Sequence, residues 1–172
     1  MKLSFDEFFE LKTELEVTPI LEDDELRFTK VSHPQLYYTV IGKKDDSVAL
    51  FTEKSFIFSL ANEKLNNFIC NKFEEPLEHL YMVHRLIYGA GGFAKRHKDR
   101  FTTHKTVSII LSDKFEGGDM YINDERVQCN EKGEYVVFNG GRDWHEVKEV
   151  TSGYRDVLIV WFSKKQSKFN LI

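Results

Sequence analysis

The hydrophobic pattern predicts two amphipathic helices in the first half of the chain. The first follows Ser4, which forms a capping-box sequence with Glu7 three residues later. Its apolar positions recur at roughly helical spacing, at Phe5, Phe8, Phe9, Leu11 and Leu15. The second predicted helix runs from Ser59 to Phe73, and Pro76 lies just beyond it, as expected where a helix ends.

Short β-rich runs dominate the rest of the chain. Three candidate strands precede the second helix, at Arg27–Val31, Gln35–Ile41 and Ser47–Phe51. After Pro76 eight more alternate with turn-forming residues, at Leu80–Tyr88, Phe93–Asp99, Lys105–Leu111, Asp119–Ile122, Arg126–Cys129, Glu134–Phe138, Trp144–Val147 and Tyr154–Phe162. Eight short strands at this spacing fit a double-sheet jelly roll of the cupin type. The predicted fold class is therefore mainly β (α+β), with N-terminal helices packed on one sheet.

The length of 172 residues suits one domain with one core. We expect a single domain over residues 1–172, in which about 1–78 supply helices and supporting strands and about 79–163 form the β core. The aromatic content of 14% also favours β structure.

Charge and composition exclude several classes of protein. The net charge is −4, and no basic block could follow a phosphate backbone, so nucleic acid is not an expected partner. One small basic cluster, Lys95, Arg96, Lys98 and Arg100, is predicted to be a solvated strand and loop. The two cysteines, Cys70 and Cys129, are too far apart for a zinc knuckle and are predicted to be reduced core thiols. The acidic start and the lack of a long apolar run predict a soluble, cytoplasmic protein with no membrane contact.

A candidate metal-binding pair occurs in the segment His97-Lys98-Asp99. Side chains two residues apart on a strand project to the same face, so His97 and Asp99 can chelate one ion while Lys98 points away. An H-x-D pair alone is weak evidence, because six histidines in 172 residues allow it to arise by chance. A further histidine from another strand would complete two histidines and one carboxylate, the facial triad typical of non-haem iron(II) oxygenases.

Only His104 and His145 follow Asp99 in the chain. His104 is five residues away, which is too close for a separate distal strand. His145 begins a new β run after the turn at Asn139-Gly140-Gly141. The predicted metal ligands are therefore His97, Asp99 and His145.

Arg155 is the candidate anchor for an anionic ligand. It lies in a β-branched run and shares a face with Val157, Ile159 and Trp161. Burying an arginine there is costly unless an anion meets it, and a dicarboxylate can accept bidentate hydrogen bonds from its guanidinium. A salt bridge to a structural Asp or Glu is the alternative.

These motifs resemble the prolyl-4-hydroxylase-like branch of the 2-oxoglutarate/Fe(II)-dependent dioxygenase superfamily. The resemblance covers about Leu80 to Phe162, roughly half of the chain. It rests on motifs in the family's order: Tyr88–Phe93 leading into His97-Lys98-Asp99, Val107–Ser112, Gly117-Gly118-Asp119-Met120, Gly133–Phe138, Trp144–Val147, Val150–Arg155 and Trp161-Phe162.

The resemblance implies a double-stranded β-helix core in which His97, Asp99 and His145 bind iron and Arg155 anchors the distal carboxylate of 2-oxoglutarate. Tyr88 resembles the family tyrosine that reaches this co-substrate, with a packed aromatic as its alternative. Strand parity also puts Thr106 and Ser108 on one face, as candidate hydroxyl donors beside Arg155. His84 and Trp161 are pocket-lining candidates, with ordinary core residues as their alternative.

The implied reaction is hydroxylation of a C–H bond with release of succinate and CO2. Its cofactors and co-substrates are Fe(II), 2-oxoglutarate and O2, with ascorbate as a candidate addition. A peptidyl prolyl or other protein residue is the expected substrate, and a free amino acid or other small molecule is the alternative.

The chain departs from the family pattern in three places. Ser112 replaces the usual Asn, Asp119 replaces the usual Glu, and Arg100–Lys105 is short compared with the lid of peptide-binding members. The short stretch argues against peptidyl proline, unless a lid comes from region 42–60. Two other classes stay open: a non-catalytic cupin-like binding module, and a metal-dependent isomerase or hydrolase on the same barrel.

Overall fold

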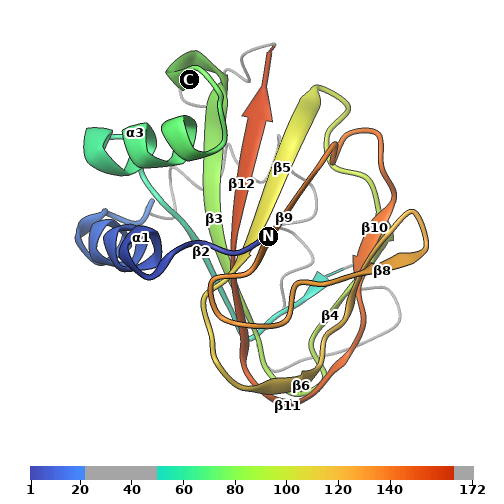
Figure 1. Cartoon of the computed structure of the whole chain (residues 1–172). Helices are drawn as coiled ribbons and strands as arrows, with labels where there is room; N and C mark the ends of the chain where they lie inside the picture. Colours follow the sequence, from blue (N-terminus) through green and yellow to red (C-terminus); the bar gives the residue numbers. More distant parts are fainter. Residues whose placement is uncertain (22–49, 165–172) are drawn as a thin grey trace.

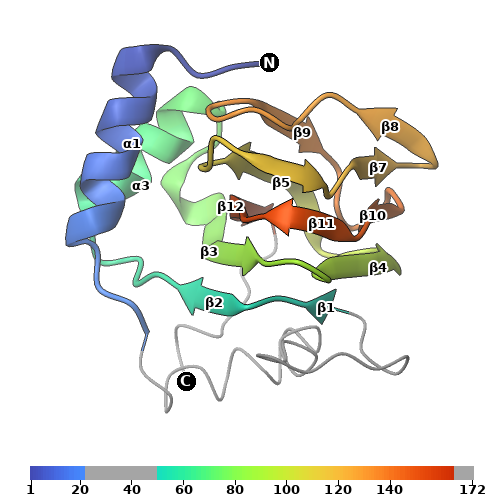
Figure 2. The same ribbon diagram turned by 90° about the horizontal axis from the view of Figure 1, so that it is seen from below.

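The computed structural model describes residues 1–21 and 50–164. Two β-sheets face each other, and the two helices cover the outer face of one of them (Figure 1). Figure 2 shows both helices on one side of the molecule, away from the strands of the second sheet. The predicted mainly β fold with N-terminal helices on one sheet is confirmed.

Helix α1 spans Phe5–Val17 and begins at the predicted capping box. The Ser4 hydroxyl accepts from the backbone N–H of Glu7 at 3.1 Å, and the Glu7 side chain accepts from the backbone N–H of Ser4 at 2.9 Å. These bonds satisfy two donors at the helix start that would otherwise have no partner. Leu11 and Leu15 are the buried residues of this helix.

Helix α3 spans Glu63–Lys72, four residues shorter at its start than predicted. The reason is a cap: the Asn62 side chain accepts from the backbone N–H groups of Lys64 and Leu65 and so sets the first turn. Apolar residues of both helices pack against the sheet that they cover, which is the larger one and is called the major sheet below. The shared core cluster includes Leu11, Leu15, Leu65, Ile69, Val83, Val107, Ile109, Leu158 and Val160.

The major sheet has five antiparallel strands in the order β2-β3-β12-β5-β9. Their bounds are Lys54–Ile57 for β2, Leu80–Tyr88 for β3, Arg155–Ser163 for β12, Thr103–Ile110 for β5 and Tyr135–Phe138 for β9. A short 3-10 helix, η2 (Leu77–His79), follows Pro76 and leads into β3. The two central strands, β3 and β12, pair along almost their whole length.

The minor sheet has five strands in the order β1-β4-β10-β7-β8. Their bounds are Leu50–Phe51 for β1, Phe93–His97 for β4, His145–Val147 for β10, Met120–Ile122 for β7 and Glu125–Val127 for β8. A two-stranded ribbon of β6 (Phe115–Gly117) and β11 (Val150–Gly153) closes one end of the structure (Figure 1). Together the sheets form a double-stranded β-helix.

All eight strands predicted after Pro76 are present, and β3 has the predicted bounds. Strands β2, β6 and β11 are missing from the prediction. For β6 and β11 the reason is that their glycines indicate turns, whereas Gly117 and Gly153 have φ values of 72° inside this paired ribbon. The predicted strands Arg27–Val31 and Gln35–Ile41 lie outside the described residues, as does the start of Ser47–Phe51.

Both cysteines are free and buried, as predicted. Burial raises the pKa of each thiol to about 11. No helix among the described residues is long and apolar enough to cross a membrane.

Candidate metal centre and ligand pocket

Three potential metal ligands meet between the sheets. His97 ends β4 and His145 begins β10, and the two are directly paired across the minor sheet. Asp99 follows two residues after β4 and places Oδ1 3.3 Å from His145 Nε2 and 3.7 Å from His97 Nε2. The three ligand atoms lie within 4.8 Å of one another. The structure therefore brings together the three residues that the sequence predicts as a triad.

Backbone carbonyls orient both imidazoles. His97 Nδ1 lies 2.6 Å from the carbonyl oxygen of Lys95, and His145 Nδ1 lies 2.9 Å from that of Asp143. A carbonyl only accepts hydrogen bonds, so Nδ1 of each neutral ring carries the hydrogen and donates it. Nε2 of each ring faces Asp99 and is then the atom left to bind a metal through its lone pair.

Asp99 is held by a hydroxyl and by a close backbone contact. The Thr106 hydroxyl donates to Asp99 Oδ2 at 2.9 Å, and the Asp99 backbone N–H donates to the Gly140 carbonyl at 2.8 Å. A Cβ at position 140 would overlap both Asp99 Oδ2 and Thr106 Oγ1, so a larger residue there would displace the Asp99 carboxylate or its hydroxyl partner. Thr106 thus contacts Asp99, whereas the sequence places it beside Arg155.

Burial, charge and hydrogen bonding shift the pKa of each triad residue in the metal-free protein. Burial alone would lower the pKa of His145, but its hydrogen bond to Asp99 and the charge of Asp99 raise it overall. Burial alone would raise the pKa of Asp99, but the hydrogen bond and charge of His145, with smaller contributions from His97 and Thr106, lower it overall. Burial and the neighbouring His145 lower the pKa of His97, which favours its neutral form. Two imidazole nitrogens and one ionised carboxylate oxygen can hold a first-row transition metal and leave coordination positions open.

Arg155 lies at the start of β12, directly opposite Tyr88 on β3. It is 1% exposed, and neither Nε nor Nη2 has a hydrogen-bond partner. No Asp or Glu among the described residues forms a salt bridge with Arg155, so the structural ion pair considered as the alternative is not seen there. Gly118 allows the aliphatic part to lie close, because a Cβ there would be 3.0 Å from Arg155 Cδ.

Tyr88 packs beneath this guanidinium, whose Cζ lies 5.5 Å from the ring centroid. Burial raises the pKa of Tyr88 to about 12 despite the opposing charge of Arg155, so its hydroxyl stays a neutral donor at physiological pH. A buried cation stacked on an aromatic ring still lacks the anion that would offset its desolvation.

The triad and Arg155 line one cavity of about 380 Å³. Its other lining residues are Leu50, His84, Leu86, Tyr88, Ala94, Lys98, Arg100, Thr106, Ser108, Met120, Phe138, Glu146, Val147, Ile159 and Trp161. The buried Ser108 hydroxyl has no hydrogen-bond partner, whereas His84 Nε2 lies 2.6 Å from the Ser55 hydroxyl. The unpartnered polar atoms of Arg155 and Ser108 fit an anionic ligand inside this cavity.

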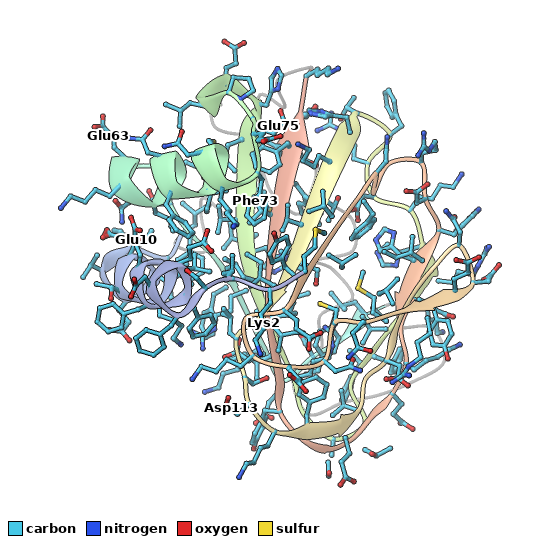
Figure 3. The ribbon with its side chains drawn as sticks, in the orientation of Figure 1. Lys2, Glu10, Glu63, Phe73, Glu75 and Asp113 are labelled. Atoms are coloured by element: carbon cyan, nitrogen blue, oxygen red, sulfur yellow. The ribbon has the colours of Figure 1, made fainter. Side chains whose placement is uncertain are left out.

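His104 lies in a different cluster, so the structure does not bring it to the triad. Glu75 contacts His79 at 2.7 Å, His104 at 2.8 Å and Lys105 at 3.1 Å, just beyond the end of α3 beside the major sheet (Figure 3). Burial alone would raise the pKa of Glu75, but hydrogen bonds from these three side chains lower it to about 2. The three contacts satisfy the carboxylate without a metal.

Sequence reasoning missed two features of the site. The turn at Asn139-Gly140-Gly141 is predicted only as a loop, although its position just before His145 could have indicated a role at the centre. Lys98 is predicted to point away from the site. Strand alternation ends with β4 at His97, however, and Lys98 lines the cavity with its ammonium 4.9 Å from the Trp144 ring centroid.

Comparisons with known proteins identify a related family. Residues 81–163 match the model of the 2OG-Fe(II) oxygenase superfamily, which confirms the resemblance over the β core. An oxidoreductase of the 2OG-Fe(II) oxygenase family from Burkholderia pseudomallei is 13% identical, with a TM-score of 0.58 and coverage of 94% of this chain and 80% of that one. No curated protein matches the sequence significantly.

Two prolyl hydroxylases share the fold. A prolyl-4-hydroxylase from Pseudomonas putida is 18% identical with a TM-score of 0.52, covering 93% of this chain and 100% of that one. A viral collagen prolyl hydroxylase from Paramecium Bursaria Chlorella virus-1 is 15% identical with a TM-score of 0.53. The match covers 83% of this chain and 91% of that one. At these identities the structural likeness shows the fold alone.

Proposed function

We propose that this chain, whose residues 81–163 match the 2OG-Fe(II) oxygenase superfamily, is an iron(II)- and 2-oxoglutarate-dependent oxygenase. In this proposal His97, Asp99 and His145 hold the iron, and Arg155 holds the distal carboxylate of 2-oxoglutarate. Tyr88 and Ser108 donate hydrogen bonds to the co-substrate. O2 is the second co-substrate, and ascorbate is a candidate reductant. The whole chain is proposed to form one domain, with its β core at about 79–163.

The observation that carries this proposal is the burial of Arg155 without a partner for two of its nitrogens. Metal-binding triads of this kind also serve other chemistries, but a metal-dependent isomerase or hydrolase leaves this arginine without a role. Its Nε and Nη2 atoms are buried without partners in the same cavity as the triad. A ligand that carries a carboxylate at one end and metal-binding oxygens at the other would satisfy both ends of this cavity.

When bound, the iron would supply an oxidation that converts a C–H bond, O2 and 2-oxoglutarate into a hydroxyl group, succinate and CO2. The protein's own residues would position the metal ligands and the co-substrate and limit the water around them. Thr106 and Gly140 hold Asp99 so that one carboxylate oxygen faces both histidines. Arg155 and Tyr88 select and orient the dicarboxylate. Apolar walls from Leu86 and Ile159 limit the water around the reacting groups.

For the substrate we propose a peptidyl prolyl or other protein residue. The support is the fold that the chain shares with a prolyl-4-hydroxylase from Pseudomonas putida and with a viral collagen prolyl hydroxylase. A free amino acid or other small molecule is the alternative, since Arg100–Lys105 is short compared with the lid of peptide-binding members.

The test has two stages. First, the visible charge-transfer absorption of the protein with Fe(II) and 2-oxoglutarate is recorded without oxygen, in the wild type and in His97→Ala and Arg155→Met. We expect the band in the wild type, loss of iron binding in the first variant and a much weaker response to 2-oxoglutarate in the second. Equal 2-oxoglutarate affinity in the wild type and Arg155→Met would overturn the assignment.

The second stage adds oxygen and screens prolyl peptides, amino acids and metabolites by mass spectrometry. The proposal expects a gain of one oxygen that requires 2-oxoglutarate, with matching succinate. A non-catalytic binding module would release no succinate with any candidate, and an isomerase or hydrolase would remain active without oxygen.

A further inference from the structure

The mouth of the cavity carries a small basic and aromatic surface, which we call the basic rim: Arg96, Lys98, Arg100, Phe101 and Trp144. Lys98 and Arg100 line the cavity itself. The Trp144 ring lies under two cations, with Arg96 Cζ 4.5 Å and Lys98 Nζ 4.9 Å from its centroid. The rim lies next to the proposed metal centre, because these residues flank Asp99 and His145 in the chain.

Two charged groups at or beside the rim already have ion-pair partners. Arg96 pairs with Asp124 at 3.0 Å, and Glu146, a cavity-lining acid, pairs with Lys148 at 2.8 Å. Within residues 1–21 and 50–164, Lys98 forms no salt bridge, and its ammonium contacts the exposed Trp144 ring. A lysine held on an aromatic ring at a cavity mouth is already positioned, so an incoming anion need not order it.

Iron and 2-oxoglutarate would not neutralise this lysine. A divalent iron, the Asp99 carboxylate, the doubly charged co-substrate and the Arg155 guanidinium have opposite charges that cancel one another. The filled interior is then neutral overall, and the charge of Lys98 at the mouth is not offset by it. An acidic substrate would therefore meet a positive charge at the mouth that no carboxylate of the filled cavity offsets.

We propose that the substrate is an acidic peptide segment, in which a carboxylate side chain near the oxidised residue is held by Lys98. This inference rests on the proposed oxygenase function. A peptide is favoured over a small anion because the rim continues into exposed aromatic surface: Phe101 is 82% exposed and Trp144 is 40% exposed. Exposed rings of this size suit the backbone and side chains of a longer ligand.

The size of the cavity agrees with such an occupant. A volume of about 380 Å³ lies near the lower end of the range for small-molecule sites. Once a co-substrate fills the inner part beside Arg155, the space left at the mouth suits one side chain better than a second complete metabolite. The rest of the ligand would then lie across the rim.

The test measures peptide binding directly, by fluorescence anisotropy of the full chain with and without Mn²⁺ and 2-oxoglutarate. The probes are three fluorescein-labelled peptides that share a central proline and differ only in flanking residues, which are Asp, Ser or Lys. A single-stranded DNA oligonucleotide is the fourth probe. We expect the Asp-flanked peptide to bind about tenfold more tightly than the Lys-flanked one, and the preference to fall as salt rises.

Charge-reversal variants show whether the preference for the Asp-flanked peptide depends on the basic rim. Lys98→Glu should weaken binding of the Asp-flanked peptide by about fivefold and improve binding of the Lys-flanked one. Lys114→Glu is the matched control, because it changes the net charge equally but does not line the cavity. It should alter binding less than twofold. Thermal unfolding of each variant confirms that the fold is kept.

Several results would overturn the proposal: equal affinity for the three peptides, equal effects of the Lys98 and Lys114 reversals, or tighter binding of the oligonucleotide than of the acidic peptide. A failure of the proposed oxygenase function would be seen separately, because anaerobic 2-oxoglutarate binding and succinate release are measured without any peptide selectivity.

Discussion

Replacement of Arg155 by Met should strengthen the fold and weaken 2-oxoglutarate binding at the same time. Met keeps most of the aliphatic stem that packs beside Gly118 but removes the charge. In the ligand-free protein this charge is 1% exposed and two of its nitrogens have no partner. Removing a buried, unsatisfied charged group should raise the free energy of unfolding by about 1–3 kcal/mol.

The ligand-bound protein should respond in the opposite direction. A hydrogen bond to a charged group contributes about 1.5–3 kcal/mol, so losing the guanidinium contacts with a carboxylate should cost about 3 kcal/mol. This corresponds to roughly 100-fold weaker 2-oxoglutarate binding. The same co-substrate concentration that stabilises the wild type by about 2.7 kcal/mol, at 100 times its dissociation constant, should then stabilise Arg155→Met only slightly.

The assay is thermal unfolding with Mn²⁺, with and without 2-oxoglutarate. For a chain of this size about 1 kcal/mol shifts the melting temperature by roughly 2–4 °C, so both effects are measurable. Arg85→Met is the matched control, because Arg85 lies on the neighbouring strand and pairs with Asp156 through contacts of 2.9 and 2.5 Å. This variant should lower the melting temperature and leave the 2-oxoglutarate response unchanged.

The reasoning is refuted if Arg155→Met is destabilised as much as Arg85→Met and still responds fully to 2-oxoglutarate. That result would mean that Arg155 has a structural partner and no role in ligand binding.

Three further predictions concern the surroundings of the site. Thr106→Val removes the donor to Asp99 at nearly constant volume and should weaken Mn²⁺ binding by about tenfold in titration calorimetry; unchanged affinity would contradict the contact at Oδ2. Gly140→Ala should reduce Mn²⁺ affinity and lower the free energy of unfolding by about 2 kcal/mol or more, because its Cβ overlaps the same carboxylate, and an unaltered melting temperature and affinity would count against it. Glu75→Gln should destabilise the protein by about 3 kcal/mol at pH 7, since the folded-state pKa of Glu75 is lowered from 4.5 to about 2. Because this stabilisation is present above the unfolded pKa and is lost as pH falls through the folded pKa, the difference from wild type in urea unfolding should shrink between about pH 4.5 and pH 2, and a constant difference would exclude this ionic cluster as its source.

The features that could be predicted from the sequence depend on residues that lie close together in the chain. The Ser4–Glu7 capping box depends on residues three positions apart, and strand β3 depends on a continuous β-rich run, so both are readable in the sequence. The proximity of His97 and Asp99 likewise follows from their separation by one residue. The distances of His104 and His145 from Asp99 in the chain distinguished them, whereas the pairing of His145 with His97 is known only from the structure.

Other features depend on distant segments meeting. The sequence shows an arginine in a β-branched run, but only the sheet register shows that Arg155 lies opposite Tyr88 with unpartnered nitrogens. Thr106 is assigned by strand parity to Arg155, yet the loop after β4 brings Asp99 within reach of its hydroxyl first. Lys98 follows strand alternation only while the strand continues, and β4 ends one residue before it.

The sequence by itself therefore determined the class of fold, the candidate ligands and the presence of a basic cluster, because these follow from composition, periodicity and short spacings. The tertiary structure alone decided which polar atoms lack partners, which glycine must stay small and which lysine faces the cavity. The physical reason is that burial and hydrogen-bond satisfaction are properties of the packed chain, set by contacts between residues far apart in sequence.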